Sequence, residues 1–221
     1  FTQDLTLLSD MTYLSPTYSG GNYLLIFFRN TDKYYSLMID RTTLSYSQNL
    51  INYNRLIVND VSIELSLDIY KGTIVDGILV GPNDFIVNDV YMFQGVNCAE
   101  DRLYNKLLNF KSYLANNLKT EQNNLNLIVN NVYNMKDINL MLNQDLPKLT
   151  YNKYIKGISF FPSKSATKLI FLYNNCAKDT AATVHALDNE FKNNLLGLKP
   201  INKKIICDED NKTNQIFLMK K

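Results

Sequence analysis

Apolar residues gather in short runs over the first 95 residues, and polar, turn-forming stretches separate the runs. The aromatic and β-branched runs 22–29 and 33–41 are joined by the turn-forming sequence NTD, so this region predicts a β-hairpin. Residues 55–80 favour two or three further strands. The sequence GPND at 81–84 indicates a turn before the apolar run 85–93. We therefore expect mainly antiparallel sheet up to about residue 95.

The spacing of apolar residues changes after Cys98. Four of them recur at steps of three or four positions: Leu103, Leu107, Phe110 and Leu114. This spacing places them on one face and predicts an amphipathic helix. Asn97 is the candidate N-cap, and Glu100 and Asp101 then fall in the first turn, where acidic side chains interact favourably with the helix dipole.

The remaining sequence predicts both helices and strands. Residues 124–144 favour a strand followed by a second helix, which Leu146 and Pro147 end near Asp145. Further expected elements are strands at 158–161 and 168–173, a helix at 180–198 closed by Gly197, and a hairpin of 203–210 with 214–220. No repeat or linker divides the chain. We therefore expect one α+β domain over residues 1–221, which could be part of a longer protein.

Composition limits the classes of function. A chain of 221 residues with 46% hydrophobic and 20% charged residues can bury a substantial core. Its net charge of +2 is too small to indicate general binding to nucleic-acid backbones, so an RNA partner would have to be bound locally. No apolar run reaches the roughly 18 residues that a membrane span needs, and we expect no membrane partner.

The cysteine and histidine content argues against a metal site. Cys98, Cys176 and Cys207 form no CxxC pair, which indicates neither a zinc site nor a disulfide framework and favours a reducing, cytoplasmic setting. The single His185 lies among small and apolar residues and is interpreted as structural. Abundant Asn, Tyr, Ile and Lys with no Trp are typical of an AT-rich genome, as in some parasites and large DNA viruses, so a viral protein in the host cytoplasm is one interpretation.

The expected strands follow one another in a recognisable order. The segments that carry it are 15–28, 34–41, 70–80, 84–95, 154–164 and 215–221. In this order they resemble the nucleotidyltransferase core of mRNA capping enzymes and of ATP- or NAD-dependent ligases. The resemblance implies antiparallel sheets flanked by helices.

The catalytic motifs of that family are altered in this chain. The family's KxDG motif, whose lysine attacks the α-phosphate, aligns with Thr17–Gly20, so threonine replaces lysine and Ser19 replaces the acidic residue. Ile78 follows Asp76 and Gly77 where the family has the glutamate of DGE. A threonine hydroxyl cannot form the phosphoramidate intermediate. The resemblance therefore implies a pseudo-enzyme with no catalytic residue.

A later family motif, EGxVxK, is altered as well. Lys156 and Phe161 stand where its glutamate and lysine would contact the metal and the phosphate. Phosphoryl transfer depends on metal and cation stabilisation of the moving phosphate, so these changes together should abolish it. We accordingly expect no metal and no cofactor.

A non-catalytic relative suggests what the fold could still do. The cap-binding domain of snurportin is similar to this chain over DVYMFQG, which places Phe93 at the aromatic that stacks on methylated guanine. The resemblance implies an aromatic sandwich, a carboxylate for the guanine edge, and lysines for the triphosphate bridge. The candidates for the sandwich are Phe93, Phe85, Phe161, Tyr13 and Tyr18. The candidate carboxylate is Asp76 or Asp89. The candidate lysines are Lys156, Lys164, Lys220 and Lys221. Aromatic residues in apolar strands are equally typical of a protein core.

The favoured prediction is therefore non-catalytic binding of the 7-methylguanosine cap, with capped mRNA as partner and translation initiation or RNA recruitment as the setting. Stacking of the cationic base on aromatic faces would contribute roughly 1–3 kcal/mol per face. Translation or capping proteins are possible further partners. Two alternatives remain open: a scaffold subunit of a capping complex, and a divergent guanylyltransferase that uses another lysine, such as Lys33 or Lys71.

Overall fold

The structure, a computed structural model, describes residues 10–44, 56–119, 123–166, 168–173 and 216–219. These residues form two compact units. Of the described residues, unit 1 contains 10–17, 132–162, 168–173 and 216–219, and unit 2 contains 18–44, 56–119, 123–131 and 163–166. Both units are therefore discontinuous in sequence. The single domain expected over residues 1–221 stays a prediction.

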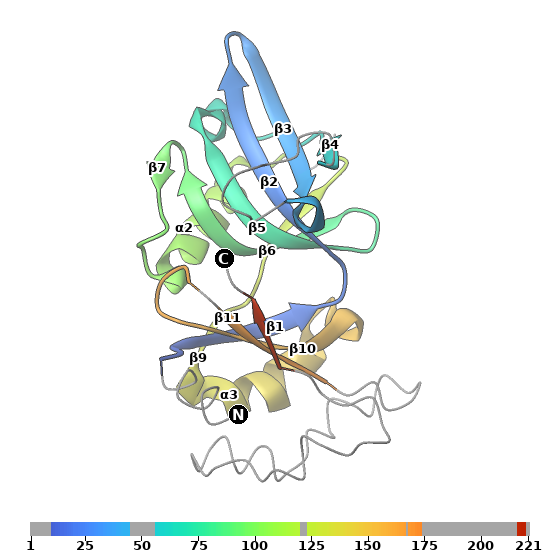
Figure 1. The fold of residues 1–221 in the computed structure, drawn as a ribbon, viewed down its shortest axis with the longest axis vertical. Coiled ribbons are helices and arrows are strands. Elements are labelled where there is room, and N and C mark those ends of the chain that lie inside the picture. Colours follow the sequence, from blue (N-terminus) through green and yellow to red (C-terminus); the bar gives the residue numbers. More distant parts are fainter. Residues whose placement is uncertain (1–9, 45–55, 120–122, 167, 174–215, 220–221) are drawn as a thin grey trace. The chain divides into compact units, whose positions relative to one another are not determined.

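Unit 2 is built on a seven-stranded sheet (Figure 1). Its strands are β2 (Gly21–Asn30), β3 (Lys33–Asp40), β4 (Val58–Asp60), β5 (Thr73–Val80), β6 (Asp84–Phe93), β7 (Val96–Asn97) and β8 (Asn126–Val129). They lie in the order β4-β3-β2-β5-β6-β7, and β8 pairs with the first residues of β6. The β6–β8 pair is parallel, while the other pairs in this sheet are antiparallel.

The expected hairpin and the expected GPND turn are confirmed. Strands β2 and β3 pair from Tyr23–Asp40 to Asn30–Lys33 around a turn at Thr31, which has a positive φ of 54°. Strands β5 and β6 pair around the GPND turn, where Gly81 has a positive φ of 64°. Turn residues between apolar runs thus account for the pairing of β2 with β3 and of β5 with β6.

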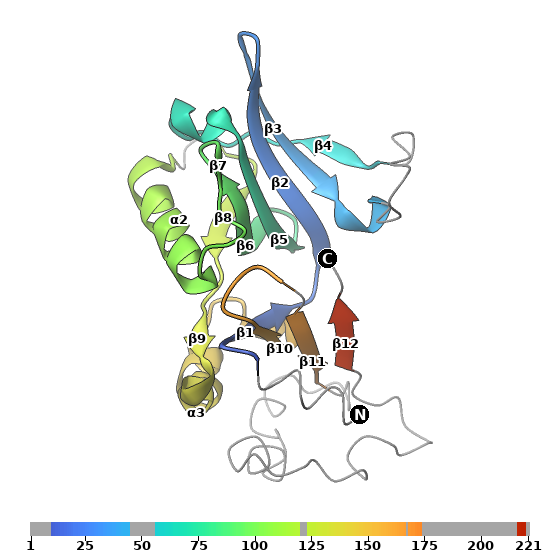
Figure 2. The same cartoon turned by 60° about the vertical axis from the view of Figure 1, so that its left-hand side comes forward.

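Helix α2 (Leu103–Asn117) follows the sheet in unit 2 and packs against β6 and β8 (Figure 2). Its buried face contains the four expected apolar residues and one cation: Leu103, Leu107, Phe110, Leu114 and Lys106. The predicted amphipathic helix is therefore confirmed, and its polar member Lys106 was not expected.

The predicted start of this helix is wrong. The helix begins at Leu103, so Glu100 and Asp101 precede it and its first turn contains no acidic residue. Asn97 Oδ1 accepts instead from the backbone N–H of Ala99, at 2.9 Å. The N–H of Leu103 donates to the carbonyl of Ser163, at 2.9 Å. Residues 163–166, which we call the strap, thus satisfy a helix N–H group that usually bonds to a capping side chain.

Unit 1 contains a five-stranded sheet in the order β12-β11-β10-β1-β9. Its strands are β1 (Tyr13–Tyr18), β9 (Tyr133–Asn134), β10 (Ile155–Phe161), β11 (Lys168–Leu172) and β12 (Ile216–Met219). The strands expected at 158–161 and 168–173 are thus present. Strand β12 pairs with β11. Residues 203–210, its expected hairpin partner, lie outside the described residues, as does the helix expected at 180–198.

The second expected helix is an irregular helical run. It consists of a 3₁₀ turn at Met135–Asp137, α3 (Ile138–Leu140), a π turn at Met141–Asp145 and a 3₁₀ turn at Leu146–Lys148. It continues three residues beyond Asp145 because Pro147 occupies the first turn of the last 3₁₀ segment, where its missing N–H costs no hydrogen bond. The apolar side of this run packs with Leu14, Ile158, Phe160 and Leu169 to form the core of unit 1.

The observed fold class is α+β, with two predominantly antiparallel sheets and few helices, as expected. Within the described part of the chain, no helix is long and apolar enough to span a bilayer. Cys98 is a buried free thiol. Cys176, Cys207 and His185 lie outside the described residues.

Candidate functional site

Thr17, which the resemblance aligns with a catalytic lysine, is 4% exposed on β1. Its hydroxyl is 2.6 Å from that of Ser159 on β10, within unit 1. Buried hydroxyls in proteins are usually hydrogen-bonded, and these two are hydrogen-bonded to each other. Thr17 therefore has a structural role in unit 1, and its alignment with the family's nucleophile stays a prediction.

Glycine is required at two positions where the backbone packs closely, one between β1 and β2 and one inside β5. A Cβ at Gly20 would lie 2.1 Å from the carbonyl oxygen of Leu79. A Cβ at Gly77 would lie 2.4 Å from the ring of Phe85 and 2.5 Å from the carbonyl oxygen of Ile86. Both positions therefore require glycine for close packing, and no ligand is needed to explain them.

Asp76 and Asp89 are direct cross-strand partners on β5 and β6, and both are buried. Asp76 Oδ1 accepts from the guanidinium of Arg41, which lies in the 3₁₀ turn Arg41–Thr43 after β3. A buried carboxylate needs such a partner, since an isolated charge is costly away from water. The structure therefore brings the two predicted carboxylates together, but Asp76 already has a cationic partner.

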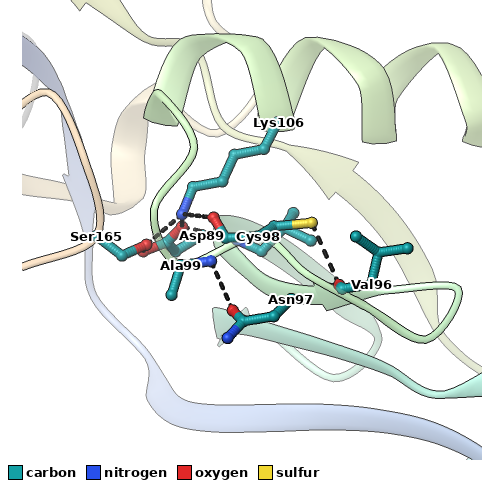
Figure 3. A network of polar contacts seen from close by, with 8 residues as sticks. Asp89, Val96, Asn97, Cys98, Ala99, Lys106 and Ser165 are labelled. Atoms are coloured by element: carbon teal, nitrogen blue, oxygen red, sulfur yellow. Dashed lines mark hydrogen bonds and ion pairs between the residues drawn. The ribbon is translucent and has the colours of Figure 1, made fainter.

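Asp89 has a cationic partner of its own (Figure 3). Lys106 Nζ lies 2.6 Å from Asp89 Oδ1, and the two side chains are 2% and 9% exposed. The hydroxyl of Ser165 donates to Asp89 Oδ2 at 2.9 Å and accepts from Lys106. We refer to Asp89, Lys106 and Ser165 as the Asp89 cluster. Its charges compensate each other inside unit 2.

Four of the five predicted aromatic residues are buried. Phe85 is 0% exposed, Tyr18 is 4%, Phe161 is 6% and Tyr13 is 8%. Phe161 also has Lys168 Nζ 5.6 Å from its ring centroid, within unit 1. A base could stack on any of these rings only after the side chain had moved. Phe93, at the end of β6, is the partly exposed member of the five.

The predicted phosphate-contacting lysines fall in different units or outside the described residues. Lys156 is exposed on β10 of unit 1. Lys164 is exposed in unit 2 and pairs with Glu100 at 3.0 Å. Lys220 and Lys221 lie outside the described residues. Lys33 and Lys71, the alternative nucleophiles, are exposed in unit 2.

Phe93 belongs to an aromatic group with two rings of α2. Its centroid lies 5.7 Å from that of Phe110 and 5.2 Å from that of Tyr113, with interplanar angles of 85° and 80°. Edge-to-face contacts of this kind are favourable and fix ring orientation. The ring is therefore positioned by α2 and not by a neighbour stacked on it.

A carboxylate that sequence reasoning missed lies beside this group. Asp68 Oδ1 accepts from the hydroxyl of Tyr113 at 3.0 Å and from the hydroxyl of Ser66, and its Oδ2 accepts from Gln94 Nε2 at 2.6 Å. The hydrogen bond from Ser66 is the main cause that lowers the pKa of Asp68 below its usual value. We refer to Asp68, Ser66, Gln94, Tyr113 and Phe93 as the Asp68 cluster.

Two observations bear on covalent and metal chemistry in the described residues. Burial raises the pKa of the Cys98 thiol, and a protonated thiol is a poor nucleophile. No group of three or more His, Cys, Asp or Glu side chains in the described part of the chain is placed to hold a metal ion. The arrangement in unit 2 suits binding, through a partly exposed aromatic ring and a hydrogen-bonded carboxylate.

Comparison with models of known protein families and with curated protein sequences gives no match.

Proposed function

We propose that the protein binds the 7-methylguanosine cap of mRNA without catalysing nucleotidyl transfer. Phe93 stacks on the cationic base, and capped mRNA is the partner. The proposal places the protein in the cytoplasm, where it recruits messages for translation or RNA handling together with translation or capping proteins. The resemblance of its strand order to capping enzymes motivates the proposal.

One observation carries it. Among the five aromatic residues that the resemblance implies, Phe93 alone is partly exposed, and it is also the one that aligns with the cap-stacking aromatic of snurportin. A ring oriented by T-shaped contacts with Phe110 and Tyr113 loses little conformational freedom when a base stacks on it. Such a preorganised platform favours affinity.

The environment of Thr17 supports the absence of catalysis. Its hydroxyl is engaged with Ser159 inside the sheet of unit 1. Residues 17–20, which the resemblance aligns with the KxDG motif, contain no lysine. The proposal therefore gives this position a structural role.

The direct test is the affinity of the purified protein for 7-methyl-GTP and for GTP, measured by calorimetry. We expect 7-methyl-GTP to bind more tightly, because methylation makes the ring cationic. Phe93→Ala should weaken 7-methyl-GTP binding by about 5- to 150-fold, the cost of one lost stacking partner. Phe28→Ala is the matched control, since Phe28 is also half-buried in unit 2 and stacks on Tyr35 at 5.1 Å, on the β2–β3 hairpin.

Equal and negligible affinity for both nucleotides would exclude cap binding and leave the scaffold alternative. The guanylyltransferase alternative has a separate test. Incubation with labelled GTP and Mg²⁺ should give no covalent product, and an acid-labile adduct on Lys33, Lys71 or any other lysine would overturn the proposal.

A further inference from the structure

We infer that Asp68 is the carboxylate that recognises the guanine edge of a cap stacked on Phe93. This inference rests on the proposed function and names the residue that makes the site specific for guanine. Neither Asp76 nor Asp89, the two carboxylates that the sequence suggested, takes this role.

Asp76 and Asp89 are unsuited because each is already neutralised. Arg41 pairs with Asp76, and Lys106 pairs with Asp89, in both cases between side chains that are at most 14% exposed. Freeing either carboxylate for a ligand would leave a buried cation without its partner, which is strongly unfavourable. A ligand would have to compensate that cost before it gained any affinity.

Asp68 differs because its hydrogen-bond donors are neutral. Two hydroxyls and one side-chain amide donate to it, so the cluster keeps a net negative charge, and the nearest cation that acts on it is Lys71 of the same 3₁₀ helix. Oδ2 accepts from the amide of Gln94, and a carboxylate oxygen can accept more than one hydrogen bond. A lowered pKa keeps this carboxylate ionised at neutral pH. The negative charge complements the positive charge of 7-methylguanine.

Tyr113 places the carboxylate and the platform side by side. Its ring centroid is 5.2 Å from that of Phe93, and its hydroxyl is 3.0 Å from Asp68 Oδ1. One side chain thus contacts both Phe93 and Asp68. A base stacked on Phe93 would point its Watson–Crick edge toward the carboxylate of Asp68.

The backbone around Phe93 is anchored to the segment that carries Asp68. The N–H of Gln94 donates to Thr73 Oγ1 at 3.0 Å, and the N–H of Gly95 donates to the carbonyl of Gly72 at 2.7 Å. Asp68 lies in the 3₁₀ helix Leu67–Lys71, directly before these residues. The platform and the carboxylate are therefore held in a fixed relation before a ligand arrives.

The chemistry predicts a preference for guanine over hypoxanthine. Guanine presents N1–H and the 2-amino group, and a carboxylate accepts from both. Hypoxanthine lacks the 2-amino group, so 7-methyl-ITP would lose one of the two charge-assisted hydrogen bonds while it keeps the stacking and the positive ring. The ratio of the two affinities thus reports on the carboxylate separately from the platform.

The experiment measures the affinities of 7-methyl-GTP and 7-methyl-ITP for the wild-type chain and for Asp68→Asn. We expect the wild type to prefer 7-methyl-GTP and Asp68→Asn to bind it at least about tenfold more weakly, with the preference reduced to near unity. Asp84→Asn is the matched control, since Asp84 is a half-buried carboxylate on β6 that accepts from the amide of Asn126 at 2.9 Å. It should leave both affinities unchanged.

Different results would separate the two proposals. Loss of 7-methyl-GTP binding in Phe93→Ala together with an unchanged nucleotide preference in Asp68→Asn would overturn the role of Asp68 and leave cap binding intact. An equal loss for both nucleotides in Asp68→Asn would assign Asp68 a structural role and overturn the inference as well. No binding to the wild type would overturn both.

A second variant guards against misfolding of Asp68→Asn. Asp68→Glu keeps the charge and moves the carboxylate by one methylene, so it should bind 7-methyl-GTP with a reduced preference over 7-methyl-ITP. A full wild-type preference in this variant would contradict a placed carboxylate. Thermal unfolding of each variant confirms that the compared proteins are folded.

Discussion

The Asp89 cluster and the Asp68 cluster lie in the same unit, and they treat a carboxylate in opposite ways. Asp89 is paired with a buried lysine and a serine, and its charge is neutralised inside the protein. Asp68 accepts from neutral hydroxyls and an amide, and its charge is retained. The comparison teaches that a buried carboxylate with a cation of its own stabilises the fold, while a half-buried carboxylate with neutral donors can still attract a cationic ligand.

Breaking the Asp89 cluster should have the largest effect on stability. Lys106→Ala leaves Asp89 buried without its cation, which should lower the free energy of unfolding by about 3–5 kcal/mol. Urea denaturation followed by circular dichroism measures the change. Lys111→Ala, an exposed lysine on the same helix, is the control and should stay within about 0.5 kcal/mol of the wild type.

Removing both charges should cost less than removing one. Lys106→Met combined with Asp89→Leu replaces the ion pair by apolar side chains, and such replacements are often neutral or stabilising by about 1–4 kcal/mol relative to the pair. We expect the double variant to recover most of the stability that Lys106→Ala loses. A double variant as unstable as the single one would show that the cluster stabilises the protein by something other than charge compensation.

In the Asp68 cluster the corresponding loss should be smaller. Tyr113→Phe removes one donor to Asp68 and should cost about 1 kcal/mol, the net value of one hydrogen bond. Burial raises the pKa of Tyr113 to about 12. The neutral phenol is therefore favoured in the folded state. The contribution of Tyr113 to the free energy of unfolding is present below about pH 10 and is lost as the pH rises toward 12.

Spectrophotometric titration of tyrosinate tests this assignment. The wild type should show one ionisation near pH 12 that Tyr113→Phe lacks. Tyr104→Phe, an exposed position on the same helix, should leave that ionisation in place. Loss of the step in the Tyr104 variant would contradict the assignment to Tyr113.

The contribution of Asp68 to stability should depend on pH in acid. Its pKa is lowered in the folded state from the ordinary value of 3.8, so its contribution to stability is full above that value and declines as the pH falls through the folded pKa. The stability difference between the wild type and Asp68→Asn should accordingly be constant near neutral pH and shrink in acid. A difference that grows as the pH falls would have the wrong sign.

The smallest effect is expected at an exposed ion pair near the Asp89 cluster. Lys164 and Glu100 are 55% and 84% exposed, and solvent screens their interaction. Lys164→Ala should change the free energy of unfolding by less than about 1 kcal/mol. A loss as large as that of Lys106→Ala would mean that Lys164 stabilises the strap 163–166 in another way.

The strands and α2 were predictable because their signals are local. Aromatic and β-branched runs with turn residues predicted the β2–β3 hairpin and the turn between β5 and β6, and the spacing of Leu103, Leu107 and Phe110 predicted α2. The helix start was not predictable. Its first donor is satisfied by Ser163, sixty residues downstream (163 − 103), and no local cap sequence reports such a partner.

The candidate site followed the sequence only in part. Phe93 remained a candidate, but the burial of Phe85 depends on its packing against Gly77, a contact between strands. Lys106 could have been noticed, since it lies three positions after Leu103 and four before Phe110, on the apolar face of the helix. Asp68 carries no motif, and only the folded chain places it beside Tyr113.

The chain order of the two units has a consequence for synthesis. All seven strands of unit 2 and α2 come from residues 18–131, whereas unit 1 combines β1 with strands that follow residue 131. A ribosome releases the chain from its N-terminus, and domains tend to fold as their residues emerge. Unit 2 can thus form its sheet while β1 still lacks β9 and β10. The nascent chain therefore holds β1 without its partner strands until more than a hundred further residues have been added, and the backbone N–H and C=O groups of β1 stay unpaired for that time.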